Sequence, residues 1–371
     1  MVRPCLFPLA CGVLRLVVGS RMTTVQRSQS EAKGESALEG PARRVANAVF
    51  KPVAAAIAGH AAIGGEHRSQ ASRHYNNWPE AWKEELDPHV AFRFTPGGGE
   101  AFFSTKFKQT GEKVRMREWA PRNDSELSNV RAEVNILKEV QGPNVIALYD
   151  VVEVPSVRLG LKRVLMLKEF HDTDATSVIE RAEAVSFETK MQLLADVLHG
   201  LERLAEAGVV HRDIEPTSLS IFGNCSVPLG CRLKIRNFES ACHLDSEKVR
   251  TCSEAAPVAP SIYLAPEVYT RNAPADPKQD IWSAGMSICQ MIFGEVADNW
   301  PKETIRFLLN KDIKRLRAEE PDFAGILDAM LAVDPEKRPT AAEALRDLRR
   351  VAAKRGVVLA VDGSPSTSSL A

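Results

Sequence analysis

Four short polar motifs follow one another in the second half of this sequence, and their order constrains the fold more than any other feature. A His-Arg-Asp triplet occupies residues 211–213, and an Ala-Pro-Glu triplet ends at Glu267. An Asp-Ile-Trp-Ser-Ala-Gly run begins at Asp280, and Arg338 stands within Asp-Pro-Glu-Lys-Arg-Pro. Because four such motifs do not fall into one order by chance, they are expected to belong to a single folded scaffold.

Apolar residues repeat with different periods in the two halves of the chain. Between residues 91 and 116 they alternate with polar residues, which is typical of short strands joined by glycine turns. Over residues 186–207 they recur every three or four positions, and residues 280–294 and 322–353 carry further helical segments. Strands followed by helices predict an α+β fold with two lobes, a small, mostly β N-lobe with one helix and a larger helical C-lobe.

In this order the four motifs resemble those of the protein kinases, with the resemblance covering residues 90–350. It implies a bilobal protein-kinase-like fold in which Asp213 occupies the position of the catalytic base. It also implies structural roles for three other residues. Glu267 is expected to pair with Arg338, and Asp280 to anchor the backbone of the catalytic loop.

Residues at the positions that hold ATP and magnesium in kinases depart from the family pattern. The metal-binding aspartate is replaced by Asn237, and the second metal ligand by Ser218. An amide or a hydroxyl is a poorer ligand than a carboxylate for a hard dication. Glu215 stands where a lysine is expected, which reverses a charge near the transferred phosphate. Glu239 stands in place of a glycine, and Asp213 alone survives as the potential base. No catalytic residues are expected: Asp213, Asn237, Ser218 and Glu215 are predicted to be vestigial, as are Arg117 and Glu133 at the cofactor positions.

The strand lysine that holds the phosphates of ATP in kinases is also replaced. Residues 114–117 read Val-Arg-Met-Arg where kinases have Val-Ala-Ile-Lys, so Arg117 occupies the lysine position and can pair with Glu133. An arginine there holds the helix without serving the phosphates as lysine does. The glycines at 97–99 lack the Gly-x-Gly-x-x-Gly pattern and are expected to form a plain turn. Binding of ATP and magnesium is therefore predicted to be weak or absent, with no metal site.

The N-terminal region reads differently from the rest. A charged start, a short apolar stretch and a small-residue end predict a signal peptide, with a mitochondrial-type or disordered leader as the alternative. Residues 42–63 are basic and apolar, so they are expected either to contact a membrane peripherally or to form a flexible linker. The expected domains are a signal peptide (1–20), a disordered or weakly helical arm (21–75), an N-lobe (76–170), a C-lobe (171–355) and a disordered tail (356–371).

Cysteines cluster in the C-lobe. Removal of the leader leaves five, and two disulfides among four of them would suit an oxidising compartment. The spacing leaves three pairings open, and it is also compatible with five reduced thiols. The four candidates for disulfides are Cys225, Cys231, Cys242 and Cys252.

The leader, the arm, the missing glycine loop and the C-lobe cysteines together resemble the rhoptry-kinase superfamily of apicomplexan parasites. Within it, the chain is most similar to the dense-granule branch that lacks a glycine loop. This resemblance implies secretion through a dense granule or a related organelle into the parasitophorous vacuole or cyst wall. It also implies secreted vacuolar or cyst-wall proteins as partners.

The sequence therefore predicts a secreted, catalytically inactive pseudokinase, not an enzyme, that acts as a protein-binding scaffold or regulator. Because 48 Lys and Arg balance 48 Asp and Glu, there is no global basic field, and no nucleic-acid partner is expected. The alternative is an unconventional protein Ser/Thr kinase with Asp213 as base, Arg117 as phosphate clamp and a rearranged ATP site, in which Glu239 or Glu215 is a relocated metal ligand. A third hypothesis is a membrane-associated module anchored by residues 42–63.

Overall fold

A computed structural model describes the protein over most of the region that carries the motifs. The described residues are 78–88, 91–94, 100–155, 162–245, 247–248, 251–252, 261–270, 274–294 and 302–360. They all belong to the second of two compact units, Gly65–Ala371. The predicted signal peptide (1–20) and the segment 42–63 lie outside the described residues, as does the arm (21–75).

The N-lobe is built on an antiparallel sheet with the strand order β1-β2-β3-β5-β4. Its strands are β1 (Ala91–Phe94), β2 (Glu100–Lys106), β3 (Lys113–Trp119), β4 (Leu148–Pro155) and β5 (Lys162–Glu169). Alternation along β2 buries every second residue, Ala101, Phe103 and Thr105, as the sequence pattern predicts.

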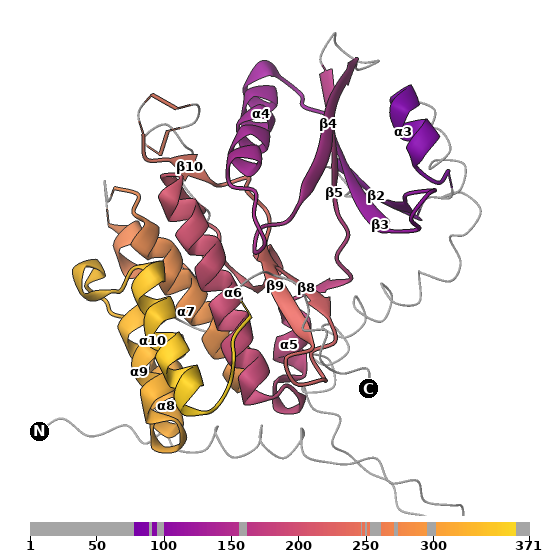
Figure 1. The fold of residues 1–371 in the computed structure, drawn as a ribbon. Coiled ribbons are helices and arrows are strands. Elements are labelled where there is room, and N and C mark those ends of the chain that lie inside the picture. Colours follow the sequence, from indigo (N-terminus) through magenta and orange to yellow (C-terminus); the bar gives the residue numbers. More distant parts are fainter. Residues whose placement is uncertain are drawn as a thin grey trace, which may run out of the picture. The chain divides into compact units, whose positions relative to one another are not determined.

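Two helices cover opposite sides of this sheet (Figure 1). Trp82 of α3 (Glu80–Glu85) packs with Phe103 and Met116 in one buried cluster. Apolar residues of α4 (Asp124–Glu139), including Val130, pack with Met166 in another. Asn123 caps α4, because its side chain accepts a hydrogen bond from the backbone N–H of Glu126 at 2.9 Å. The sheet therefore lies between two apolar layers, and β3 and β5 contribute to both.

The C-lobe is mostly helical and encloses the larger core. Its helices are α5 (Thr176–Glu180), α6 (Phe187–Glu206), α7 (Pro277–Phe293), α8 (Lys302–Glu319), α9 (Pro321–Met330) and α10 (Ala341–Lys354). Four of them, α6, α7, α9 and α10, lie where helical periodicity predicts helices, and their apolar faces meet in one cluster of buried residues. The described chain thus has the bilobal α+β fold that the sequence predicts.

Short strands carry the functional loops between these helices. They are β6 (Thr173–Asp174), β7 (Val209–Val210), β8 (Leu219–Gly223), β9 (Cys231–Ile235) and β10 (Cys242–His243). Strands β6, β8 and β9 form one small sheet, and β7 pairs with β10. Because β7 ends directly before His211 and β9 ends shortly before Asn237, the two loops that carry the motifs leave neighbouring parts of the C-lobe.

Close packing of α6 against β9 depends on Gly200. A Cβ atom at this position would lie 2.6 Å from Cδ1 of Ile235 and 3.1 Å from the carbonyl oxygen of Asn144. On the same helix, Asp196 forms a buried ion pair with Arg232, at 2.6 Å. The helix that precedes the catalytic loop is therefore fixed by both shape and charge.

Two disulfides are present, so the alternative of five reduced cysteines is not realised. Cys225 is bonded to Cys231, and Cys242 to Cys252, while Cys289 is a buried free thiol. The second disulfide closes a loop directly after the Asn-Phe-Glu segment, where β10 pairs with β7.

The start of the expected C-terminal tail (356–371) is docked on the C-lobe. The backbone N–H of Ala360 donates to Gln192 Oε1 at 2.8 Å, and the side chain of Gln192 donates back to the carbonyl of Ala360 at 3.1 Å. Residues 361–371 lie outside the described residues.

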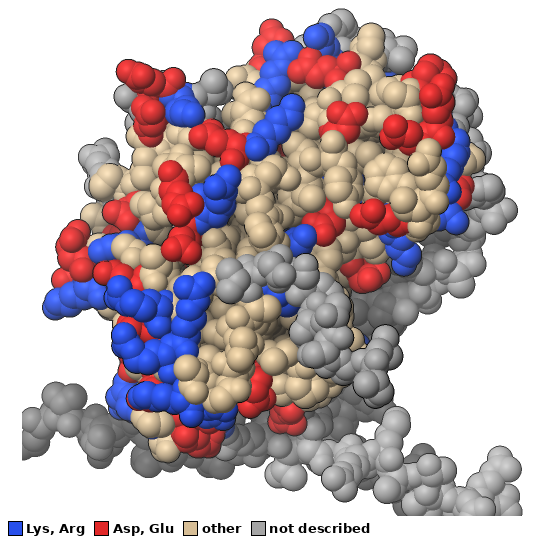
Figure 2. Space-filling model, in the orientation of Figure 1, with Lys and Arg blue, Asp and Glu red and all other residues tan. Residues whose placement is uncertain are grey.

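Charge on the surface is mixed, with one local concentration. Figure 2 shows lysines and arginines gathered over the helices α8, α9 and α10 at the lower left of the view. On α10, Arg350 pairs with Asp347, and Lys354 pairs with Asp322 of α9. Among the described residues, no helix combines the length and apolar character needed to cross a bilayer.

Candidate functional site

The catalytic loop is held by one buried carboxylate. Asp280, near the start of α7, accepts hydrogen bonds from the backbone N–H groups of His211 at 2.7 Å and Arg212 at 2.8 Å. Arg212 has a φ of 69°, in the left-handed region that non-glycine residues seldom adopt. The two bonds to Asp280 stabilise this turn, and the turn presents Asp213.

Asp213, which follows this turn, is the candidate general base. Its backbone N–H donates to Nδ1 of His211 at 3.3 Å. Burial, together with the negative charges of Glu215 and Glu239, raises the pKa of the Asp213 carboxyl to about 6. A carboxylate with a pKa slightly below neutrality is ionised at pH 7 yet still accepts a proton readily.

The Asn-Phe-Glu segment packs directly beneath this loop. The ring of Phe238 is fully buried and meets the ring of His211 edge-on, with 4.9 Å between the centroids. Nε2 of His211 lies 2.9 Å from the carbonyl oxygen of Arg236. Burial lowers the pKa of His211 to about 4, so the imidazole is neutral at pH 7. Asn237 has a φ of 66°, a conformation that asparagine tolerates well.

The residues at the two metal-ligand positions do not fit magnesium. Oδ1 of Asn237 lies 3.4 Å from Nη1 of Arg236, so a cation already faces the amide oxygen. The hydroxyl of Ser218 is buried, with no hydrogen-bond partner in the described part of the chain. Within that same part, no group of three or more His, Cys, Asp or Glu side chains that could hold a metal ion is found. The roles suggested for Glu215 and Glu239 as relocated metal ligands stay predictions.

Arg117 of β3 is the centre of a network of acidic side chains. Its Nη1 lies 3.0 Å from Oε1 of Glu133 on α4, as the sequence predicts. Its Nη2 lies 2.9 Å from Glu100 and 2.8 Å from Glu239. These three carboxylates raise the pKa of Arg117, although burial opposes them as the largest single influence. The network links β2, β3, α4 and the Asn-Phe-Glu segment.

Lys168 belongs to the same network and is not found by motif comparison. It lies on β5, beside Arg115 in the strand register, and its Nζ is 3.2 Å from Oε1 of Glu133. Burial lowers its pKa, and the charge of Glu133 opposes that shift. In the sequence, Lys168 directly follows the apolar residues 164–167 of a predicted strand. A charged residue is unusual next to such a buried run, and this position is the signal that could have revealed it.

A cleft of about 230 Å³ opens beside this network. Four cationic side chains line it: Arg115, Arg117, Lys168 and Arg236. The other lining residues are Phe102, Ile146, Glu169, His171, Asn237 and Glu239. Sequence reasoning anticipated a cleft that had exchanged its cations for neutral or acidic groups, but β5 and the residue after β9 supply two cations that motif comparison does not reveal.

The other predicted structural pair also meets in space. Nη1 of Arg338 donates to Oε1 of Glu267 at 2.8 Å and to the carbonyl oxygen of Lys278 at 2.6 Å. The Arg338 side chain is fully buried, so this pair ties the Ala-Pro-Glu segment to the base of the C-lobe. Glu215 turns toward its own loop, where its carboxylate accepts a hydrogen bond from Thr217.

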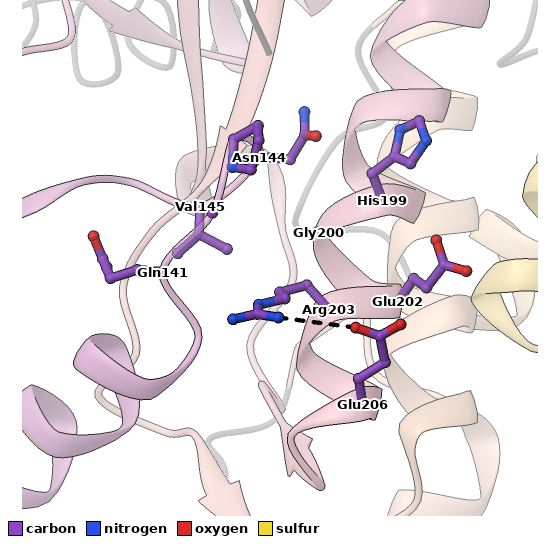
Figure 3. A pocket seen from close by; sticks show the side chains of 10 residues that line it. Gln141, Asn144, Val145, His199, Gly200, Glu202, Arg203 and Glu206 are labelled. Carbon is purple, nitrogen blue, oxygen red and sulfur yellow. Dashed lines mark ion pairs between the residues drawn. The ribbon is translucent and has the colours of Figure 1, made fainter. Parts of the chain in front are cut away.

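A second cavity, of about 260 Å³, lies between the loop after α4 and one side of α6 (Figure 3). Arg203 and Glu206 pair across its edge at 4.0 Å. None of the predicted site residues lines it.

Comparison with known proteins points to one family. The family model described as "Protein kinase domain" matches residues 97–348. Mitogen-activated protein kinase 13 of Mus musculus is 31% identical over 276 residues, which cover 64% of this chain and 71% of that protein. Mitogen-activated protein kinase 12 of Rattus norvegicus is 30% identical over 284 residues, 67% of this chain and 74% of that protein. Serine/threonine-protein kinase atg1 of Dictyostelium discoideum is 27% identical over 221 residues, 59% of this chain and 32% of that protein.

These comparisons contradict the prediction that the chain is not an enzyme. The relatives that it resembles are, by name, mitogen-activated protein kinases. The prediction rested on replaced motif residues, and it did not take account of the cations that the fold brings into the cleft. The matched family model spans both lobes, and the His-Arg-Asp loop is bonded to Asp280 of the Asp-Ile-Trp-Ser-Ala-Gly motif. The chain belongs to the protein kinase family.

Proposed function

We propose that this chain is an unconventional protein Ser/Thr kinase in which Asp213 is the general base and side-chain cations take over the neutralisation of phosphate charge. The observation that carries the proposal is the convergence of Arg115, Arg117, Lys168 and Arg236 on one cleft. Phosphoryl transfer depends almost entirely on positioning and on charge neutralisation, both of which cationic side chains can supply.

The chemistry assigns a role to each part of the site. The carboxylate of Asp213 accepts the proton of a substrate hydroxyl. The oxygen of that hydroxyl bonds to the terminal phosphorus of ATP. The bond from that phosphorus to the bridging oxygen breaks, and this oxygen keeps the electron pair as ADP leaves. Arg117 and Lys168 lie on the sheet above, where they can stabilise that charge.

The test is transfer of labelled phosphate from ATP to a mixture of Ser- and Thr-containing peptides. Asp213→Asn is expected to lower the rate by about 10²–10⁴-fold, as loss of a general base does. Asp347→Asn, at a half-exposed position of α10, serves as the matched control and should leave the rate unchanged. Because the chain's own residues do not fit magnesium, transfer is expected to persist in a chelator. A wild-type chain that transfers nothing, with or without added metal, would end the proposal.

We also propose that the protein works in an oxidising compartment, as the resemblance to secreted dense-granule kinases implies. Two disulfides within the C-lobe support this, because such bonds seldom persist where glutathione keeps thiols reduced. Secreted proteins of the parasitophorous vacuole or cyst wall would then be the protein substrates. Expression of the tagged chain with and without residues 1–20 tests it: a chain that stays in the cytosol in both forms would contradict secretion.

A further inference from the structure

The walls of the cleft suit a phosphate chain better than a base. Phe102 and Ile146 are the apolar side chains among its lining residues, and the remainder are charged or polar. Pockets for drug-sized ligands are mostly apolar and measure about 300–1,000 Å³, so 230 Å³ with this lining is small for a nucleoside. We infer that the cleft recognises the phosphate chain of its ligand and does not discriminate between bases.

Arg115 closes the side of the cleft that faces the connection after β5. Its Nη1 lies 2.6 Å from Nε2 of His171, and its Nη2 donates to the carbonyl oxygen of His171 at 3.0 Å. The guanidinium also lies 5.3 Å from the ring centroid of Phe170. Arg115 therefore already contacts the groups that a base entering here could bind, namely the ring nitrogen and carbonyl oxygen of His171 and the aromatic face of Phe170. Base-specific hydrogen bonds at this wall would therefore require Arg115 to leave.

Arg236, another lining residue, offers donors for anionic oxygen atoms. Arg236 pairs with Asp174 at 3.2 Å, but its Nε is buried without a hydrogen-bond partner in the described residues. A buried unsatisfied guanidinium nitrogen costs free energy that an anionic oxygen would recover. Arginine also binds phosphate through two parallel N–H bonds, which gives the contact a defined geometry.

Glu239 occupies the place that a phosphate oxygen would take on Arg117. Its carboxylate lies 2.8 Å from Nη2, and its side chain is 49% exposed. The other two carboxylates on Arg117 are far less exposed, 2% for Glu133 and 16% for Glu100. Exposed ion pairs contribute little stability, so Glu239 is the partner that an incoming anion displaces most readily. In the free protein, Glu239 holds the phosphate position closed.

The inference deepens the proposed function by naming the ligand class of the same cleft, and binding measurements test it apart from catalysis. Isothermal titration of the full, disulfide-intact chain would use ATP, GTP, tripolyphosphate and adenosine, all in a chelator. We expect the three phosphorylated ligands to bind within about threefold of one another, and adenosine at least about 30-fold more weakly. Binding of ATP more than about tenfold tighter than GTP and tripolyphosphate would overturn the inference, as would equal binding of adenosine.

Glu239→Gln adds a second readout. Removal of the competing carboxylate is expected to tighten tripolyphosphate binding by about tenfold, the value of one charge-assisted contact. Glu153→Gln is the matched control, because Glu153 also pairs with an arginine, Arg131, but at the edge of the sheet. An unchanged affinity in Glu239→Gln would count against displacement of Glu239.

The two proposals fail in different ways. If tripolyphosphate binds but no Asp213-dependent transfer occurs, the kinase proposal falls and the ligand class stands. If transfer occurs but binding ranks the ligands by their base, the ligand class falls and the kinase proposal stands.

Discussion

The carboxylate of Glu133 on α4 lies 3.0 Å from Nη1 of Arg117 on β3, and both side chains are almost fully buried. Lys168 approaches the same oxygen from β5, so two cations share one acid. This arrangement fixes α4 against the sheet and sets the charge at the upper wall of the cleft.

Glu133→Ala should therefore destabilise the protein strongly. It leaves two buried cations without their shared carboxylate, and loss of one member of a buried pair costs about 3–5 kcal/mol. Urea denaturation followed by circular dichroism measures the free energy of unfolding. Glu153→Ala, which breaks an exposed pair with Arg131, should cost at most about 1 kcal/mol. Similar losses in both variants would show that burial of the Glu133 network contributes little.

Arg338→Ala should lower stability by a comparable amount. The change strands the Glu267 carboxylate and removes donors from the carbonyl oxygens of Lys278 and Ala332. A cost of about 3–5 kcal/mol is expected for such a buried hydrogen-bonded charge. The neighbouring Lys337→Ala alters a side chain that is mostly exposed and should leave the unfolding midpoint where it is.

The transfer rate should rise with pH through about 6. The pKa of Asp213 is raised to about 6, so the base becomes ionised as the pH increases past that value. Glu215→Gln removes one of the like charges that raise this pKa, and the midpoint should move to lower pH. Initial rates between pH 4.5 and 8 give the pH profiles of the wild-type chain and of Glu215→Gln, and the midpoint of each profile reports the pKa of the general base. A rate that is flat across this range would remove Asp213 from the role of base.

The same shift has a defined sign for folding. Asp213 has a higher pKa in the folded chain than the ordinary 3.8, so the unfolded chain releases this proton first as pH rises. Its contribution to the free energy of unfolding should therefore fall between about pH 4 and pH 6. In Asp213→Asn, the free energy of unfolding should not show this decrease between pH 4 and pH 6, while the rest of its pH dependence remains.

Thiol labelling should distinguish the five described cysteines. In denatured, unreduced protein, an alkylating reagent should modify Cys289 and none of the four disulfide-bonded residues. Loss of the disulfide in Cys242→Ser/Cys252→Ser should cost about 2–4 kcal/mol, because the unfolded chain gains freedom. Mass spectrometry of tryptic peptides reads the labelling, and modification of Cys242 in the unreduced protein would refute the pairing.

Gly200→Val tests the contact between α6 and β9. A side chain here meets Ile235 and the backbone of Asn144, so overpacking should cost about 1–3 kcal/mol. Gly325→Ala on α9 is the matched control, since nothing lies within 4 Å of the new methyl group. That change should stabilise the helix by up to about 1 kcal/mol, and thermal unfolding separates the two results.

The amino-acid sequence by itself determined the fold class and the family. Strand and helix periods, together with the motifs that contain Asp213, Asp280 and Arg338, depend on local spacing, which a linear reading preserves. The pairing of Arg117 with Glu133 could also be anticipated, since both occupy aligned positions in one lobe.

The tertiary structure alone decided the charge of the cleft. Lys168 and Arg236 belong to no catalytic motif, and they reach the site because β5 lies beside β3 and because the segment after β9 turns beneath the sheet. Glu239 contacts Arg117 across 122 positions of sequence. Electrostatic interactions depend on distance in space rather than on sequence separation, so the balance of charge at a site between two lobes follows from how the chain folds.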